Sequence, residues 1–146
     1  GSRESTTPGT NGKLSEIASA YGLAVLDLRE RELNDWKLSN DKARRVAVDL
    51  GVDSIVSHYP GVSPYWIAQF PDSASATRAN QLMRRNGIET RNWWGSGLAS
   101  MPAFSAHARE SYPTTTQVAQ STIGLPMFRD LSDSHLDLIS KCLATS

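Results

Sequence analysis

Side chains that could act in catalysis or bind a metal ion are present, but they are widely spaced. The three histidines, His58, His107 and His135, have no partner at the spacing of metal ligands, and no zinc motif occurs. We expect each to be a surface histidine or one whose hydrogen bonds are satisfied. The acidic residues are scattered, and neither a glycine-rich phosphate-binding motif nor a GxSxG motif is present. Residue types and spacing alone therefore indicate no particular reaction.

Cysteine content and net charge limit the classes of partner. The single cysteine, Cys142, cannot form a disulfide within the chain and lies in a predicted terminal helix, so we expect a small buried residue and not a nucleophile. One cysteine in 146 residues is typical of a reducing compartment. Fifteen basic side chains balance fifteen acidic ones, which argues against nucleic acid or an anionic membrane as the main partner. No apolar run approaches the ~20 residues of a membrane-spanning helix.

The N-terminal third of the chain predicts helices. Apolar residues between Leu14 and Leu28 recur at spacings of three and four, which draws one stripe on a helix, and Asn11 is a candidate N-cap. Gly22 costs about 1 kcal/mol relative to alanine, and the expected compensation is close approach of another backbone. Charge alternates in sign over residues 29–40, as on a solvated helix face. We interpret residues 14–50 as two helices or one bent helix.

Later segments predict a small sheet with covering helices. Runs rich in β-branched and aromatic residues predict strands at Ile55-Val56, Tyr65–Phe70 and Ile88–Trp93, with a further short extended segment at 123–126. Residues 94–113 are typical of a loop. The predicted order of helices and strands is that of an α+β fold, in which helices cover a small sheet on one side and a long connecting helix precedes it.

Three more helices are predicted around that sheet. One runs from about 74 to 86, with Ser73 or Ser75 as its N-cap, and a second covers 114–121. The last follows Ser132 as N-cap, where Leu131 and Leu136 form a hydrophobic staple across the cap.

Four segments carry motifs in a fixed order. Residues 9–16 read Gly-Thr-Asn-Gly-Lys-Leu-Ser-Glu, and Gly-Leu-Ala-Val-Leu follows at 22–26. Residues 86–91 read Asn-Gly-Ile-Glu-Thr-Arg. An aromatic pair and Met-Pro-Ala-Phe occupy the two ends of 93–104, and 123–132 contains Ile-Gly-Leu-Pro-Met-Phe followed by Leu-Ser. Together they resemble the signatures of the DegT/DnrJ/StrS family of pyridoxal-phosphate (PLP) dependent sugar aminotransferases.

The resemblance implies a position within a larger enzyme. Family members are fold-type-I homodimers of well over twice this length, with active sites at the dimer interface. By this resemblance residues 1–28 are the tail end of the large PLP-binding domain, and residues 29–146 are the C-terminal small domain with a mainly antiparallel sheet. The lysine that joins the cofactor precedes the first motif in the family. We therefore expect no catalytic residue in this chain, no activity from it alone, and no retained PLP.

The same resemblance suggests binding residues. The family asparagine that matches Asn11 reaches across the dimer to the cofactor phosphate, whereas the alternative role of Asn11 is a helix cap. Lys13 stands where the family more often has arginine and could contact a nucleotide-sugar phosphate as a point charge. Arg91 is expected to face the substrate entrance or to lie on an exposed strand. Trp93 and Trp94 are expected to offer ring faces to the sugar or base, or to belong to the core.

The implied reaction is amino transfer from glutamate to a nucleotide-linked keto sugar, in cytoplasmic biosynthesis of surface polysaccharide or lipopolysaccharide. Ala99 stands where many members have histidine, and residues 95–97 replace the usual proline, so the resemblance does not fix the sugar. Two alternatives remain: a fragment of a related PLP-dependent sugar dehydratase, and a stand-alone binding or dimerisation module without catalysis. No nucleic acid, membrane or metal is expected as a partner. As a fragment, the chain should expose the apolar face of residues 14–28 and self-associate.

Overall fold

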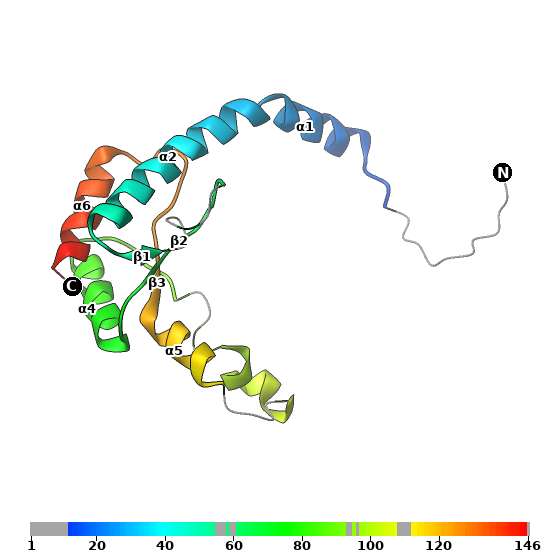
Figure 1. The fold of residues 1–146 in the computed structure, drawn as a ribbon. Helices are drawn as coiled ribbons and strands as arrows, with labels where there is room; N and C mark the ends of the chain where they lie inside the picture. The colour runs from blue at the N-terminus through cyan, green and yellow to red at the C-terminus, as the bar shows by residue number, and fades with distance from the viewer. Residues whose placement is uncertain are drawn as a thin grey trace. The chain divides into compact units, whose positions relative to one another are not determined.

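The computed structural model describes residues 12–54, 58, 61–92, 95, 97–107 and 112–145 (Figure 1). The chain divides into two compact units, residues 1–32 and residues 33–146. The elements, in chain order, are α1 (Glu16–Asp27), α2 (Arg29–Asp49), β1 (Asp53–Ser54), β2 (Trp66–Gln69), α4 (Ser73–Arg85), the 3-10 helices η1 (Leu98–Ser100) and η2 (Pro102–His107), α5 (Pro113–Ser121), β3 (Thr122–Leu125) and α6 (Asp133–Ala144).

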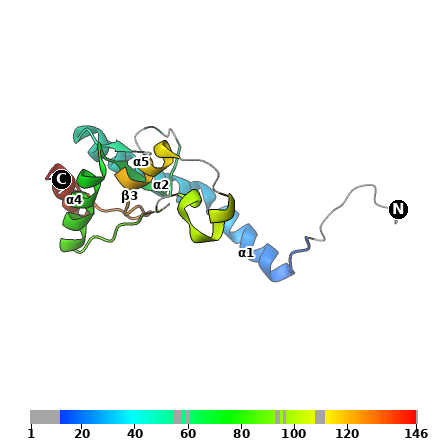
Figure 2. The same ribbon diagram turned by 90° about the horizontal axis from the view of Figure 1, so that it is seen from below.

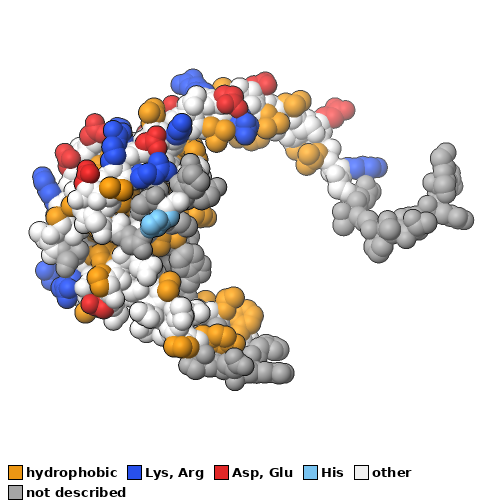
Figure 3. Space-filling model, viewed as in Figure 1, with side chains coloured by type: hydrophobic (Ala, Val, Ile, Leu, Met, Phe, Trp, Pro, Cys, Tyr) orange, Lys and Arg blue, Asp and Glu red, His pale blue; other side chains and the backbone are white. Residues whose placement is uncertain are grey.

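Helix α1 has no buried residue. Its N-cap is Ser15, whose side chain accepts a hydrogen bond from the Ala18 N–H at 3.2 Å, so the prediction of Asn11 as the cap is wrong. Asn11 itself lies outside the described residues. The predicted exposed apolar face is confirmed, since Ile17 is 84% and Tyr21 74% exposed, and Figure 3 shows hydrophobic side chains along this helix. Apart from its chain neighbours and the backbone of its own helix, no described atom lies within 4 Å of a Cβ built on Gly22, so the expected backbone approach is not present there.

A break at Leu28 separates α1 from α2, which confirms two helices over residues 14–50. The charge pattern predicted a solvated helix face over residues 29–40. The structure differs at the end of this stretch, where two residues are buried. Ser39 and Asn40 are only 3% and 1% exposed. Both side chains are hydrogen-bonded, which is why two polar residues can be buried next to a charged stretch.

Among the described residues, the sheet has three antiparallel strands in the order β1-β2-β3. This confirms the predicted α+β fold with a small antiparallel sheet. Strand β2 lies inside the predicted Tyr65–Phe70 run, and the extended segment predicted at 123–126 corresponds to β3. The strand predicted at Ile55-Val56 lies outside the described residues, directly after β1.

The strand predicted at Ile88–Trp93 is wrong for its described part. Within residues 88–92, only Arg91 pairs with the sheet, as an isolated bridge to Gly124. The reason is the end of α4, where Gly87 takes a positive φ of 73° and its N–H bonds to the Arg84 carbonyl. The N–H of Ile88 then bonds back to the Met83 carbonyl at 2.9 Å. This is a Schellman ending, and it turns Ile88 into the core before the chain can extend.

Alternate strand residues and the covering helices form one core. Trp66 and Ala68 of β2 and Ile123 and Leu125 of β3 point to the same face because side chains alternate along a strand. Phe70, Ile88 and Leu131 also belong to the cluster. Helices α2, α4 and α6 contribute its other members: Ala43, Ala47, Ala76, Ala79, Met83, Leu136, Ile139, Cys142 and Leu143. Figures 1 and 2 show the sheet beside these helices. Cys142 is 4% exposed, as predicted, and burial raises the pKa of its thiol.

The observed N-cap agrees with the predicted one in α6 but not in α4. Asp72 caps α4 by accepting the Ser75 N–H at 2.7 Å, so the predicted caps, Ser73 and Ser75, are wrong and lie inside the helix. This hydrogen bond is the main cause that lowers the pKa of the exposed Asp72 carboxyl. Ser132 caps α6 as predicted, and both staple residues, Leu131 and Leu136, are buried.

The 94–113 stretch is less irregular than predicted, because it holds η1 and η2. Helix α5 agrees with the prediction of 114–121 and begins with a proline at its first position. Among the described residues, no helix combines the length and apolar character that a bilayer crossing needs.

Candidate functional site

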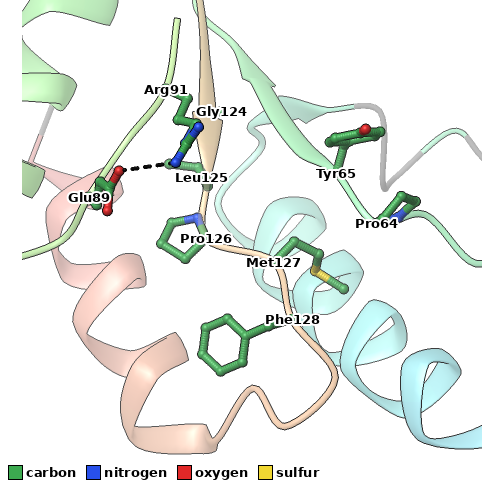
Figure 4. A pocket seen from close by; sticks show the side chains of 9 residues that line it. All are labelled: Pro64, Tyr65, Glu89, Arg91, Gly124, Leu125, Pro126, Met127 and Phe128. Atoms are coloured by element: carbon green, nitrogen blue, oxygen red, sulfur yellow. Dashed lines mark hydrogen bonds and ion pairs between the residues drawn. The ribbon is translucent and has the colours of Figure 1, made fainter. Parts of the chain in front are cut away.

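A pocket of about 430 Å³ opens at one end of the sheet, and we call it the Arg91 pocket (Figure 4). Its lining residues come from three separate chain segments: Pro64, Tyr65, Glu89, Arg91, Gly124, Leu125, Pro126, Met127 and Phe128. It therefore joins the second and fourth of the sequence motifs, which lie more than 30 residues apart.

Strand pairing explains why these three segments meet. Trp66 lies opposite Leu125 in the β2–β3 register, so Tyr65 just before β2 and Pro126 just after β3 flank the same end of the sheet. On the other edge of β3, Arg91 and Gly124 exchange two backbone hydrogen bonds, of 3.0 and 2.7 Å. The pocket is thus a direct product of the antiparallel register.

The pocket combines one cation with exposed aromatic rings. The Arg91 side chain is 65% exposed, and its Nη2 lies 3.5 Å from a carboxylate oxygen of Glu89. Such an exposed ion pair holds its partners weakly. Tyr65 is 46% and Phe128 39% exposed. A guanidinium fork can bind phosphate or carboxylate, and ring faces can stack on a planar group, so this surface suits an anion that carries a ring.

Two walls of the Arg91 pocket, one formed by Pro64 and Tyr65 and the other by Phe128, are linked to α2 by hydrogen bonds of neighbouring residues. The Asn40 Oδ1 accepts the Ser63 N–H at 2.9 Å, next to Pro64 and Tyr65. The Ser39 hydroxyl donates to the Arg129 carbonyl, just after Phe128. The Phe128 ring also lies edge-on to His135, with 5.4 Å between ring centroids.

The predicted site residues lie in different parts of the structure, or outside its described residues. Arg91 lines the pocket and is also an exposed residue bridged to Gly124 at the edge of the sheet, so its contact with substrate stays a prediction. Lys13 is exposed, in the unit that precedes residue 33. Asn11, Trp93 and Trp94 lie outside the described residues.

Sequence reasoning missed Tyr65 and Phe128 as pocket residues. Their only signals were positional, because Tyr65 begins the predicted strand run and Phe128 ends the Ile-Gly-Leu-Pro-Met-Phe part of the fourth motif.

The described residues do not by themselves form a PLP site. PLP enzymes hold the cofactor through a lysine amine. The four lysines are all described: Lys13, Lys37 and Lys141 are exposed, and Lys42 pairs with Asp133 at 2.7 Å. None of them lines the Arg91 pocket. The hydrogen bond from Lys42 lowers the pKa of Asp133.

The described residues also offer no group of side chains that could bind a metal ion. Within the part of the chain that the structure describes, no group of three His, Cys, Asp or Glu side chains could hold a metal ion. His135 is exposed and completes the capping box of α6, and His58 is exposed. The His107 side chain lies outside the described part.

Comparison with solved proteins first identifies the class of fold. An aminotransferase from Brucella abortus superposes with a TM-score of 0.70 at 17% identity, covering 99% of this chain and 39% of that one. PseC of Helicobacter pylori, an aminotransferase involved in pseudoaminic acid biosynthesis, gives 0.73 at 14% identity, with 97% and 40% covered. Spr1654 of Streptococcus pneumoniae, solved in its PMP form, gives 0.73 at 18% identity, with 96% and 37% covered. At these identities the likeness shows the fold alone.

The family follows from the sequence comparison. The model of the DegT/DnrJ/EryC1/StrS aminotransferase family matches residues 2–144, and the chain belongs to that family. A curated relative is the dTDP-4-amino-4,6-dideoxy-D-glucose transaminase of Escherichia coli, 24% identical over 151 residues, covering 94% of this chain. The chain spans about two fifths (39%) of the length of that relative.

Proposed function

We propose that this chain is the C-terminal part of a PLP-dependent aminotransferase that moves an amino group from glutamate to a nucleotide-linked keto sugar. The observation that carries the proposal is the family match over residues 2–144, together with a curated relative named for a dTDP-sugar. In this proposal residues 1–28 end the large PLP-binding domain, and residues 29–146 form the small domain of a homodimer. The setting is cytoplasmic synthesis of surface polysaccharide.

The proposed division of labour leaves binding and orientation to this chain. Arg91, Lys13, Trp93 and Trp94 bind the nucleotide sugar, and Asn11 reaches the cofactor phosphate across the dimer. The support for Arg91 is its place in the pocket beside exposed aromatic rings. When bound, PLP supplies a ring that takes up electrons from the carbon that carries the amine. The lysine that holds it belongs to the preceding domain in this proposal.

The first test is turnover by the purified 146-residue chain. We expect no amino transfer from glutamate to a dTDP-linked keto sugar when PLP is added, because no lysine lines the described pocket. The E. coli relative assayed in the same mixture serves as the positive control. Product formation by the chain alone, above a heat-denatured sample, would refute the assignment to a part that lacks the cofactor lysine.

The second test concerns Arg91. We expect Arg91→Ala to weaken binding of dTDP to the chain about tenfold or more, since a charge-assisted hydrogen bond contributes about 1.5–3 kcal/mol. Isothermal titration calorimetry at low salt measures the affinity. The matched control is Arg85→Ala, an exposed arginine in the last turn of α4 that is not in the pocket. Equal losses in both variants would mean a general charge effect and would contradict a specific role of Arg91.

A further inference from the structure

Two consecutive residues of α2, Ser39 and Asn40, are almost completely buried although both are polar. They are 3% and 1% exposed. A buried hydroxyl or amide costs free energy unless it is hydrogen-bonded. Ser39 and Asn40 are neighbours on one helix, where successive side chains point about 100° apart, so each can contact a different segment.

The contacts of Asn40 make it a bridge between α2 and the chain before β2. Its Nδ2 donates to the Trp36 carbonyl at 2.9 Å, which fixes the amide against its own helix. Its Oδ1 accepts the Ser63 N–H at 2.9 Å. The Ser63 hydroxyl in turn accepts the Tyr65 N–H at 3.1 Å and donates to the Tyr65 carbonyl at 2.9 Å. The backbone of Tyr65 is therefore set through Asn40 and Ser63.

Ser39 forms a corresponding link to the chain after β3, which carries Phe128. Its hydroxyl donates to the Arg129 carbonyl, 90 residues further along the chain. The residue before Arg129 is Phe128, whose ring packs edge-on against His135. The segments that carry Tyr65 and Phe128 are thus both hydrogen-bonded to α2.

We infer that Ser39 and Asn40 are positioning residues that hold the Tyr65 and Phe128 walls of the Arg91 pocket at a fixed separation. The inference rests on the proposed function in one respect, that a nucleotide sugar binds in this pocket. Neither side chain lines the pocket, so both act through the walls. Loss of Asn40 releases Tyr65, and loss of Ser39 releases Phe128, without removing any group that touches the ligand.

The experiment uses the 146-residue chain labelled with 3-fluorotyrosine and titrated with dTDP. The variants are Asn40→Ala, Ser39→Ala, Tyr65→Ala and the Asn40→Ala/Tyr65→Ala double variant, and Tyr65→Phe assigns the Tyr65 fluorine signal. The matched control is Asn34→Ala, the same residue type exposed on the same helix. We expect Asn40→Ala to shift the Tyr65 signal and to weaken dTDP binding about tenfold, and Asn34→Ala to do neither.

The double-mutant cycle separates positioning from simple stabilisation. If Asn40 acts through Tyr65, Asn40→Ala weakens binding less than about twofold once Tyr65 is already alanine, while its effect on the melting temperature persists. An equal loss of affinity in both backgrounds would overturn the inference. If the unaltered chain does not bind dTDP, the proposed ligand class fails. The fluorine signal then still decides positioning, and an unshifted Tyr65 signal in Asn40→Ala refutes it.

Discussion

Replacing Trp66 with alanine is expected to remove a large part of the stability of residues 33–146. Trp66 is fully buried, begins β2 and lies opposite Leu125 in the core. Truncation of a buried aromatic residue costs about 3–5 kcal/mol, and a domain of this size has only about 5–15 kcal/mol in total. Urea unfolding followed by circular dichroism should show a midpoint well below that of the unaltered chain, with a similar slope.

Trp66→Phe is the matched control for that prediction. Among the described residues, the Trp66 Nε1 is the buried side-chain nitrogen or oxygen that has no hydrogen-bond partner. An unsatisfied buried donor costs about 1–3 kcal/mol, and phenylalanine removes the donor while keeping one ring. We therefore expect Trp66→Phe to cost much less than Trp66→Ala. Equal losses would mean that the ring retained by phenylalanine contributes nothing, and would contradict an explanation based on buried aromatic volume.

Gly97→Ala is expected to have the second largest effect. Gly97 has φ 88° and ψ 162°, a backbone conformation that costs other residues about 1–3 kcal/mol. An added Cβ would also lie 2.7 Å from the Cγ2 of Thr115 at the start of α5. The two penalties act together, so α5 and the η1 segment should be loosened. Thermal unfolding by calorimetry measures the loss.

A second substitution distinguishes the two causes. Thr115→Ser removes the methyl group that an alanine at 97 would meet but leaves the backbone penalty unchanged. In the Thr115→Ser background we expect Gly97→Ala to cost less than it does alone, yet still to destabilise. A Gly97→Ala variant with an unchanged melting temperature would contradict both causes.

Much of the fold was predictable because its signals are local. The apolar stripe of residues 14–28 belongs to one helix, and the cap at Ser132 and its staple lie at the start of another. The structure confirms these predictions. The cap of α4 was missed because Asp72, Ser73 and Ser75 are all good capping residues within four positions. The segment after Gly87 was misassigned because its composition suits a strand, whereas the Schellman hydrogen bonds decide its path.

The candidate site was less predictable, because its residues meet only through long-range pairing. The motif resemblance identified Arg91, and the pocket that contains it depends on the register that places Tyr65 and Pro126 at one end of the sheet. Ser39 and Asn40 were misjudged for a related reason. Their polar character predicts exposure. The hydrogen-bond partners that offset the cost of burial, the Arg129 carbonyl and the Ser63 N–H, lie 90 and 23 residues away in the sequence.

Helix α1 has one further consequence. A twelve-residue helix with no buried side chain is marginal in water, so its amide protons should exchange at rates close to those of a free peptide. The cooperatively folded region then begins within α2, where Ser39 is the first buried residue. Any surface that covers the apolar face of α1 would have to order the helix as it binds. Part of the contact free energy would be offset by that loss of conformational entropy, which makes docking of this face a coupled folding reaction.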